Sequence, residues 1–373
     1  MDMRIVQVLP RGMHFGPRRA TAIDLCARDI VEHSQYARST TVLGAPVEPP
    51  FEGIAFQAVD VHKRASQVAA AVRFAQVARA LSPDLVVVPQ NVISGAIIGR
   101  VLAAVPVLLY RHNLHKRVRA FRRFYQRWQY KQFARTIWVS DVARLSFLAS
   151  FPEFGGSAVT VHTGLDLAAW SPARQREQVV LCVGRATPDK GILEAAEALS
   201  VTLANSTGWR AQFILSRLDR NDAYLERVRR ALAPLGERAD VQTDQPHSVV
   251  RRAYETAAIA IVPSIFPEPF GRTAVEAMAG GAALVSSRSG ARPEVVGEAA
   301  ITLDRVMPEA ICAAVGRLIA DDSLRAHYAA HGRRRVERYF QLQEQAQVLD
   351  RLYATVAGTP QESWSKVAPA RAA

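Results

Sequence analysis

The sequence predicts an α/β protein with two similar halves, each a doubly wound parallel sheet covered by helices on both faces. Short, almost continuously apolar runs alternate along the chain with longer segments of helical spacing, a pattern typical of parallel sheets buried on both sides. The length of 373 residues allows two or three domains with cores of their own. We expect domains at residues 1–170 and 171–340, a further helix at 341–357 and a loose tail at 358–373.

The first half alternates in this way from its start. Its continuous apolar runs are expected to form strands, and the segments between them helices. We expect a helix that ends near residue 32, further helices at 63–81, 92–103, 118–135 and 142–150, and strands at 4–9, 41–44, 54–59, 84–89, 106–111, 136–140 and 158–162.

The second half repeats the alternation after a polar, irregular connection at residues 164–177. We expect a loop at 288–293, helices from 191 to about 205, from near 271, at 308–321 and at 323–338, and strands at 179–183, 211–215, 239–242, 259–262, 282–286 and 300–303.

The segment at residues 263–281 carries the strongest chemical pattern. Glu268 lies between two prolines, and a residue before a proline is pushed out of the helical region, so its carboxylate is expected on a stiff extended loop. A helix is expected to begin near Gly271. The free N–H groups of Gly271, Arg272 and Thr273, with the positive end of the helix dipole, would form a seat for a phosphate.

Arg272 indicates an anion at this seat, because a cation in the first turn of a helix otherwise opposes the dipole. Glu268 and Glu276 would repel that anion unless each faces a different part of the ligand. Ionised carboxylates accept hydrogen bonds, and vicinal hydroxyls donate them in pairs. The pattern therefore predicts a phosphate with a diol at each end, which describes a nucleotide sugar. For either glutamate alone, an ordinary solvated charge is an equally good interpretation.

Polar residues also follow other expected strands. Arg185 and Lys190 bracket a turn at a strand's carboxyl end, where two cations could neutralise a diphosphate, although surface charge would explain them too. His112 and Asn113 follow the strand that ends at residue 111, and either a site role or a structural hydrogen bond suits the histidine. Gly16 lies in a glycine-containing loop between a strand and a helix, just before Arg18 and Arg19, whose position also suits a nearby anion.

Charge is spread unevenly along the chain. The formal net charge is +13, and residues 1–170 hold 21 Lys and Arg against 11 Asp and Glu, a difference of 10 that leaves 3 for the rest. No acidic residue occurs between Asp84 and Asp141. This distribution indicates an anionic partner for the first half, with a membrane surface and nucleic acid as candidates.

The basic stretch at residues 116–135 is amphipathic. Because the sheet needs cover here, we expect its aromatic side to pack; the basic face, or an exposed aromatic edge, could also meet anionic lipid headgroups. Nucleic acid is not expected, since the aromatics share one face and are committed to packing. The aromatic side comprises Val118, Phe121, Phe124, Tyr125, Trp128 and Phe133, and the basic side Arg119, Arg122, Arg123, Arg127 and Lys131.

Composition favours a cytoplasmic protein, peripheral at most on the inner face of a membrane. The cysteines Cys26, Cys182 and Cys312 are far apart and are expected to be buried thiols in a reducing compartment. The N-terminus does not resemble a signal peptide. The most hydrophobic region, residues 92–110, divides better into a helix and a strand than into one membrane span.

Taken together, these segments resemble the retaining glycosyltransferases of family 4, which have the GT-B fold. The resemblance covers nearly the whole chain. It is most specific at Val183-Gly-Arg185 with Lys190, and at Glu268-Pro-Phe-Gly-Arg-Thr-Ala-Val-Glu276, which has the family's spacing of two glutamates. Residues 161–166 resemble the family's linker motif.

The resemblance implies two Rossmann-like domains facing an interdomain cleft, with the donor held mainly by the second and the C-terminal helix crossing back to the first. Arg185 and Lys190 would hold the diphosphate and Glu276 the ribose. Glu268 would hold the donor sugar, together with the main chain around Phe270 and Gly271, and His112 matches the family's active-site histidine loop.

Some positions depart from the family pattern. Thr163 stands where asparagine is usual, the loop at residues 14–17 lacks the usual glycine pair, and the strand ending at Leu215 runs into Ser-Arg. These differences affect the acceptor side and the choice of base more than the donor site.

The implied activity is transfer of a sugar from a nucleoside-diphosphate sugar to a hydroxyl acceptor with retention of configuration. The acceptor could be lipid-linked or of lipopolysaccharide type. No Asp-x-Asp motif is present, so no metal and no cofactor are expected. The alternatives are a GT-B sugar-nucleotide epimerase or phosphorylase, and a non-catalytic nucleotide-sugar-binding partner in glycan assembly.

Overall fold

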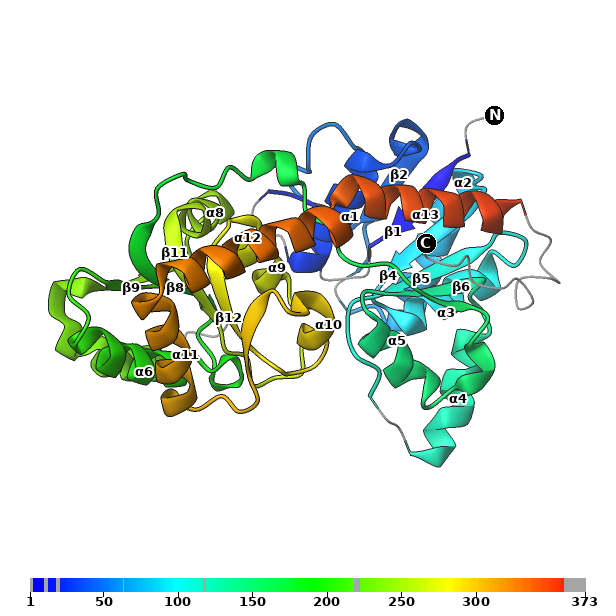
Figure 1. Ribbon diagram of the computed structural model, residues 1–373. Helices are drawn as coiled ribbons and strands as arrows, with labels where there is room; N and C mark the ends of the chain where they lie inside the picture. The colour runs from blue at the N-terminus through cyan, green and yellow to red at the C-terminus, as the bar shows by residue number, and fades with distance from the viewer. Residues whose placement is uncertain are drawn as a thin grey trace. The chain divides into compact units, whose positions relative to one another are not determined.

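A computed structural model describes residues 3–9, 13–17, 21–62, 64–116, 119–217 and 222–358. The chain forms two compact units (Figure 1). Unit 1 comprises the residues up to Gly164 together with those from Leu342 onward, and unit 2 comprises Leu165–Gln341. The chain thus leaves unit 1 at 164/165, where we expected 170/171, and returns at 341/342, where we expected 340/341.

Unit 1 contains a seven-stranded sheet in which every strand pairing is parallel. The strand order is β3-β2-β1-β4-β5-β6-β7. The chain adds β2 and β3 on one side of β1 and β4 to β7 on the other, as in doubly wound sheets. The strands are β1 (Ile5–Val8), β2 (Thr40–Gly44), β3 (Ala55–Ala58), β4 (Leu85–Pro89), β5 (Val107–Arg111), β6 (Arg135–Trp138) and β7 (Ala158–Thr160).

Four helices of unit 1 begin at side-chain caps, which are Thr21, Ser66, Asn91 and Ser140. Ser66 accepts a hydrogen bond from the Ala69 amide, so the helix expected from residue 63 begins four positions later, at Gln67. Thr21 and Asp24 form a capping box on the first helix. The helices are α1 (Ala22–His33), α2 (Gln67–Ala80), α3 (Val92–Val101), α4 (Ala120–Tyr130), α5 (Asp141–Leu148) and α13 (Leu342–Ala357).

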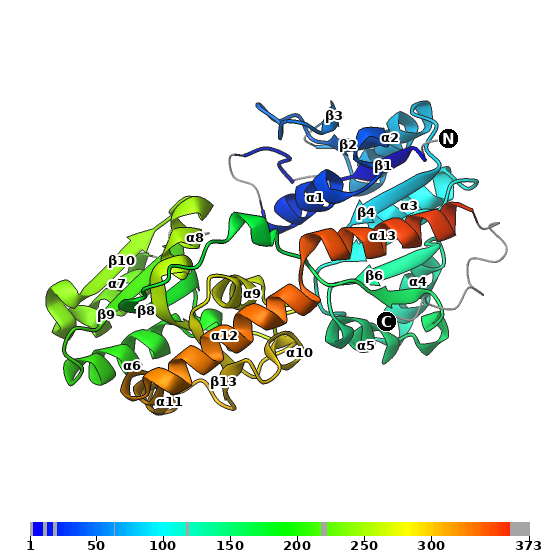
Figure 2. The same cartoon turned by 45° about the horizontal axis from the view of Figure 1, so that its top comes forward.

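The last helix, α13, packs against the first, α1, although more than 300 residues separate them in sequence (Figures 1 and 2). Asp350 on α13 is 3% exposed. Its carboxylate accepts hydrogen bonds from the Ser34 hydroxyl at 2.5 Å and the Gln35 amide at 2.8 Å, just after α1 ends. These bonds satisfy polar groups at the buried C-terminal end of α1.

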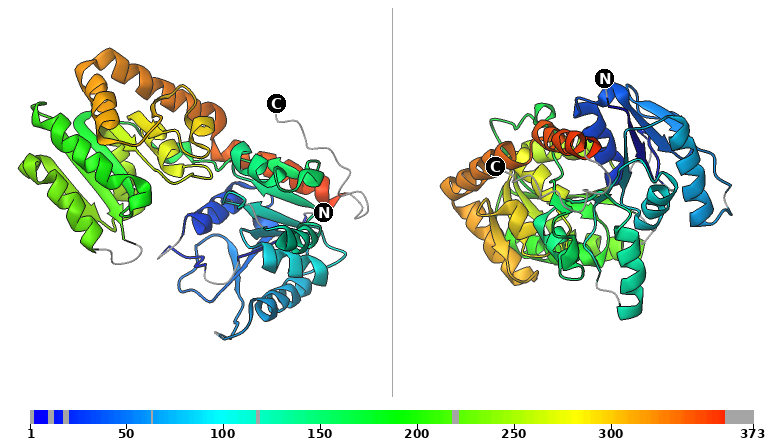
Figure 3. Two further views of the ribbon diagram at one scale, coloured as in Figure 1. Left: turned by 90° about the horizontal axis from the view of Figure 1, so that it is seen from below. Right: turned by 90° about the vertical axis from the view of Figure 1, so that its right-hand side faces the viewer.

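Unit 2 contains a six-stranded parallel sheet in the order β10-β9-β8-β11-β12-β13 (Figure 3). The chain adds β9 and β10 on one side of β8 and β11 to β13 on the other, so β8 and β11 are neighbours in the sheet. The strands are β8 (Glu177–Arg185), β9 (Arg210–Ser216), β10 (Ala239–Thr243), β11 (Ala257–Val262), β12 (Ala283–Ser287) and β13 (Ala300–Leu303).

One core of unit 2 lies between the sheet and α6, α7 and α11. Helices α7 and α8 were not predicted. Both are rich in polar residues, although Tyr224, Leu225 and Val228 of α7 have helical spacing and are buried. The helices are α6 (Ile192–Ala204), α7 (Asp222–Leu232), α8 (His247–Thr256), α9 (Arg272–Ala279), α10 (Arg292–Val296), α11 (Pro308–Ala320) and α12 (Asp322–Tyr339). Among the described residues, no helix combines the length and apolar character needed to span a bilayer.

The expectation that the aromatic side of the basic helix packs on the sheet was wrong for most of α4. Four of the aromatics that we expected to cover the sheet are exposed, by 40 to 80%. The helix instead contacts its unit through its C-terminal end, where Tyr130 packs among Phe147, Phe151 and Phe154. Amphipathic spacing therefore identified the helix but not the face that it buries. The exposed aromatics are Phe121, Phe124, Tyr125 and Trp128; Val118 lies outside the described residues.

The contact between α1 and α13 gives the first prediction. Asp350→Ala should lower the free energy of unfolding by about 2–4 kcal/mol, because it leaves the buried Ser34 hydroxyl and the partly buried Gln35 amide without their acceptor. Urea unfolding followed by circular dichroism measures the change. The control Arg351→Ala alters the next residue, which is exposed, and should cost less than about 0.5 kcal/mol. Equal losses in the two variants would contradict the role given to Asp350.

Candidate functional site

Three loops of unit 2 meet at one edge of its sheet. They follow β8, β11 and β12, which are adjacent parallel strands, so their carboxyl ends lie together. The amides of Ile265 and Phe266 both donate to the Asp189 carbonyl at 2.9 Å, and the Ala291 amide donates to the Glu268 carbonyl at 2.8 Å. The main chain therefore connects the three loops before any side chain is considered.

Two glycines allow these loops to approach. A Cβ atom on Gly191 would lie 2.2 Å from the Pro263 carbonyl oxygen, and one on Gly290 would lie 2.3 Å from the Glu268 carbonyl oxygen. Both glycines also have positive φ, of 66° and 63°. No other residue would fit at either position without displacing the loop that carries Glu268.

Glu268 and Lys190 form an ion pair across this edge. Their side chains are only 16% and 15% exposed. The same Oε1 atom of Glu268 accepts a hydrogen bond from the Ser264 hydroxyl at 3.1 Å, and the Lys190 ammonium lies 5.6 Å from the centre of the Phe266 ring. The residues expected at the donor sugar and at the diphosphate are thus in direct contact.

Arg185 is the last residue of β8, just before the loop that carries Lys190, and its side chain is more exposed than that of Lys190. Its guanidinium is 3.4 Å from a carboxylate oxygen of Asp189, and both side chains are about 40% exposed. An ion pair this exposed contributes little to stability, so the guanidinium can change partners at small cost.

The N-terminal end of α9 lies directly after the Glu268 loop. Gly271 occupies its cap position with φ 98° and ψ 58°, and it has no side chain with which to cap the helix. The Phe270 ring is buried edge-on against Phe340, with centroids 5.5 Å apart. Thr273 is partly exposed in the first turn.

Glu276, one turn further along α9, is buried and paired. Its Oε1 atom is 3.0 Å from Nε of Arg272 and 3.2 Å from Nε2 of His247. Burial alone would raise the pKa of Glu276, but the His247 hydrogen bond and the Arg272 charge outweigh it, and the pKa lies below its ordinary value of 4.5. Glu276 is therefore ionised at neutral pH.

This contact changes the interpretation of Arg272. From the sequence, a cation that opposes the helix dipole indicated a bound anion. In the structure Arg272 is matched by Glu276 on the same helix, so its position needs no bound anion.

Arg292 and His247 contact the two glutamates but were not predicted from the sequence, and Arg292 is the more buried of the two. It was placed in a loop, whereas it begins α10 with its side chain 1% exposed. Its guanidinium bonds the Val262 carbonyl at 3.2 Å and the Ser286 hydroxyl at 3.3 Å, and it lies 3.9 Å from Glu268. Nε of Arg292 has no hydrogen-bond partner. A cation at the start of a helix would have been the signal, but a loop and no helix was expected at residues 288–293.

Burial lowers the pKa of Arg292 from 12.5 to about 10, and the Glu268 charge opposes part of that shift. The guanidinium therefore stays protonated at neutral pH. Glu268 thus lies between a partly exposed cation, Lys190, and a fully buried one.

In unit 1, His112 follows β5. Its amide donates to the side chain of Gln90 at 3.0 Å, and its ring lies 4.6 Å from the Tyr110 ring. Burial, with a smaller effect from Arg111, lowers the pKa of His112 from 6.5 to about 3. The imidazole is therefore neutral at physiological pH, and Asn113 beside it is exposed.

The glycine loop of unit 1 has a packing explanation. A Cβ atom on Gly16 would lie 2.5 Å from the Pro49 carbonyl oxygen, so the close approach of residue 49 already requires glycine. Arg18 and Arg19, which suggested an anion here, lie outside the described residues.

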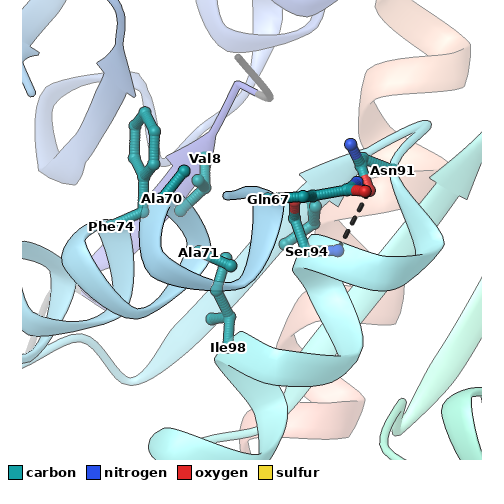
Figure 4. A pocket seen from close by; sticks show the side chains of 9 residues that line it. Val8, Gln67, Ala70, Ala71, Phe74, Asn91, Ser94 and Ile98 are labelled. Atoms are coloured by element: carbon teal, nitrogen blue, oxygen red, sulfur yellow. Dashed lines mark hydrogen bonds between the residues drawn. The ribbon is translucent and has the colours of Figure 1, made fainter. Parts of the chain in front are cut away.

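A small pocket lies between α2 and α3 of unit 1 (Figure 4). Its walls are mostly apolar, and side-chain amides gather at one end, where Gln67 donates to Asn91 at 2.9 Å. None of the residues expected at a site lines it. The lining residues are Val8, Gln67, Ala70, Ala71, Phe74, Val88, Asn91, Ser94 and Ile98.

Comparison with solved structures identifies the fold. The chain is similar to HepE from Anabaena, crystallised in complex with UDP, with a TM-score of 0.78 and 17% identity over 95% of this chain and all of the other. It is also similar to a glycosyltransferase from Rickettsia africae ESF-5, with a TM-score of 0.80 and 15% identity over 96% of this chain and all of the other. The fold is GT-B.

Sequence comparison agrees for unit 2. Residues 168–335 match the family described as glycosyl transferases group 1. A relative, phosphatidyl-myo-inositol mannosyltransferase of Mycolicibacterium smegmatis, is 29% identical over 231 residues, which are 59% of this chain and 57% of the relative. The chain thus spans a little over half the length of that relative. The candidate site of unit 2 lies within the matched residues.

The buried position of Arg292 gives the second prediction. Arg292→Met should lower the free energy of unfolding by about 2–4 kcal/mol, because it leaves Glu268 and two buried acceptors without this cation. The matched control Arg288→Met removes an arginine of the preceding loop whose side chain is 59% exposed. That control should change stability by less than about 0.5 kcal/mol in the same urea titration. A loss no larger than the control's would mean that Arg292 does not balance Glu268.

Proposed function

We propose that the protein transfers a sugar from a nucleoside-diphosphate sugar to a hydroxyl acceptor, with retention of configuration, as do family 4 glycosyltransferases. The observation that carries the proposal is the Lys190–Glu268 pair beside the N-terminal end of α9. It joins a cation, an acceptor carboxylate and a helix dipole at one sheet edge, within residues that match glycosyl transferases group 1.

The donor would use each of these groups. Arg185 and Lys190 bind the diphosphate with the main chain at Gly271, while Arg272 and Thr273 stand in the first turn behind it. Glu276 accepts hydrogen bonds from the ribose hydroxyls, which its ionised state allows. Glu268, with the main chain at Phe270, accepts those of the donor sugar.

Binding would exchange the partners of Lys190. Without a ligand its ammonium is paired with Glu268. A bound diphosphate draws the ammonium away from Glu268, because a diphosphate carries more negative charge than one carboxylate. Glu268 then keeps Ser264 and Arg292 as partners, and its lone pairs become available to sugar hydroxyls. The buried Arg292 thus supplies the charge that keeps Glu268 in place.

The reaction breaks the bond between the anomeric carbon and a diphosphate oxygen and forms one to the acceptor oxygen on the same face. The acceptor proton moves to the departing diphosphate. Negative charge grows on that leaving group, so Arg185 and Lys190 stabilise the transition state more than the ground state. These cations and the helix end supply the positive charge that a metal would otherwise provide, and we propose that the reaction needs neither metal nor cofactor.

His112 would act as a neutral hydrogen-bonding group. With a pKa of about 3 it carries no proton to donate as an acid at neutral pH. We assign it, with Asn113, to recognition of sugar or acceptor hydroxyls, and Gly16 to an acceptor-side or phosphate loop.

The acceptor is proposed to be lipid-linked or of lipopolysaccharide type, with the protein peripheral on the cytoplasmic face of a membrane. Unit 1 is strongly basic, with no acidic residue between Asp84 and Asp141. The name of the mycobacterial relative refers to a phospholipid, phosphatidyl-myo-inositol. Both observations favour an anionic, lipid-bound acceptor in the synthesis of a cell-surface glycan.

The third prediction tests donor use. In a thermal-shift panel, one of the UDP-, GDP- or ADP-sugars should raise the melting temperature, since a ligand that binds only the folded state stabilises it. Glu268→Gln should then lower kcat/KM for transfer by about 100-fold, because an acceptor for sugar hydroxyls is weakened, while binding of the free nucleoside diphosphate stays equal or tightens.

The matched control for this test is Glu298→Gln, an exposed glutamate of the same unit, which should retain full activity. Unchanged transfer in Glu268→Gln would contradict the assignment. A donor converted to a different nucleotide sugar without acceptor would identify an epimerase, and nucleotide-sugar binding without turnover would identify a binding partner. Binding of RNA that falls steeply with salt, without any response to nucleotide sugars, would identify a nucleic-acid protein.

The fourth prediction concerns stereochemistry. The anomeric proton of the transferred sugar should show the same configuration in the product as in the donor by NMR coupling constants. Retention is expected because attack and departure occur on one face. A product of opposite configuration would exclude the retaining mechanism while leaving glycosyl transfer in place.

A further inference from the structure

Helix α4 projects from unit 1 instead of lying along its sheet. Figure 1 shows its N-terminal end at the lower edge of the unit, farthest from the strands. Along residues 121–130, whose burial the structure describes, only Gln129 and Tyr130 at the end of the helix are buried. Tyr130 contacts Phe147 at 4.5 Å between ring centroids, which anchors this end. The rest of the helix is held away from the core.

The projecting part carries four large aromatic side chains on one face. Their positions follow the i, i+3, i+4, i+7 spacing of a single helix face. Phe121 and Phe124 are 71% and 80% exposed, and Tyr125 and Trp128 are 53% and 40% exposed. The buried Tyr130 falls on the opposite side of the helix. The core therefore does not explain this aromatic face, and its exposure to water costs free energy without a partner.

Cations flank the aromatic face and stand at the start of the helix, and acidic residues are scarce around them. Arg119, Arg122 and Lys131 are exposed, and the helix itself contains no Asp or Glu. Among the described residues, one carboxylate reaches this surface, since Glu153 binds Arg127 at 2.8 Å. An apolar stripe bordered by cations is the arrangement of helices that lie in the interface of an anionic membrane.

Two other occupants fit less well. A second copy of the chain, docked symmetrically through this face, would bring two sets of arginines together with no acidic residue on either helix. Single-stranded nucleic acid needs free ring faces on which bases can stack. Here the Tyr125 and Trp128 rings stack on each other, 5.9 Å apart and 18° from parallel, and the Arg122 guanidinium lies 5.8 Å from the centre of the Phe121 ring.

We propose that α4 is the membrane-docking element of this protein: Phe121, Phe124 and Trp128 enter the headgroup region of an anionic bilayer while Arg119 and Arg122 bind its phosphates. This inference deepens the proposed function, because it names the surface by which the protein would reach a lipid-linked acceptor. The docking itself requires no donor and no residue of unit 2, so it can fail or succeed independently of glycosyl transfer.

Vesicle flotation of the full chain, without nucleotide sugar, tests the proposal. The protein should float with phosphatidylglycerol-containing vesicles and not with phosphatidylcholine alone. The triple variant Phe121→Ser, Phe124→Ser, Trp128→Ser should lose flotation. The pair Arg119→Gln, Arg122→Gln should weaken binding by about 25-fold, which is about fivefold for each cation. Because these side chains are exposed, the variants should keep the circular dichroism and melting temperature of the parent protein.

The matched control is Arg229→Gln with Arg230→Gln, which removes the same charge from exposed positions on α7 of unit 2. It should float like the parent. In the parent, the emission of Trp128, obtained by subtracting the spectrum of Trp128→Phe, should shift to the blue on adding anionic vesicles. Equal recovery with both lipids, loss of binding in the control pair, or full binding by the triple variant would overturn the proposal. A dimer that the triple variant dissociates, or flotation abolished by equimolar RNA, would assign the surface to those partners instead.

Discussion

The ion pair between Lys190 and Glu268 is the interaction on which the candidate site depends. It connects the loops after β8 and β11, which the main chain of Asp189 also joins. Both side chains are about one-sixth exposed, so neither charge is well hydrated and each relies on the other. The close approach of Gly290 to the Glu268 main chain then fixes where this carboxylate can lie.

The site is balanced in charge before any ligand binds. Glu276 has Arg272 and His247, while Glu268 has Lys190 and, below it, Arg292. A buried carboxylate without such partners would be protonated or would destabilise the fold. An incoming anion therefore changes which groups are paired, and the exposed Arg185 can join it at little cost. This explains how a site with two glutamates can still accept a diphosphate.

The end of α4 that packs on unit 1 is distinct from the part that carries its exposed side chains. The helix is anchored by Tyr130 in an aromatic cluster with Phe147 and Phe151, and the ion pair between Arg127 and Glu153 adds a second contact. Its remaining aromatics contribute no core packing, so folding places few demands on them. Their presence on an otherwise basic helix is better explained by a partner outside the chain than by the stability of unit 1.

The sequence by itself determined both parallel sheets, because continuous apolar strands have only one stable environment, and it placed Glu268 on a loop between β11 and α9. It could not determine which face of α4 is buried, nor that Arg292 lies beneath Glu268. Local spacing describes one element at a time, whereas these features arise from contacts between segments far apart in the chain. Only the tertiary structure decided them, since burial and charge pairing depend on which segments the fold brings together.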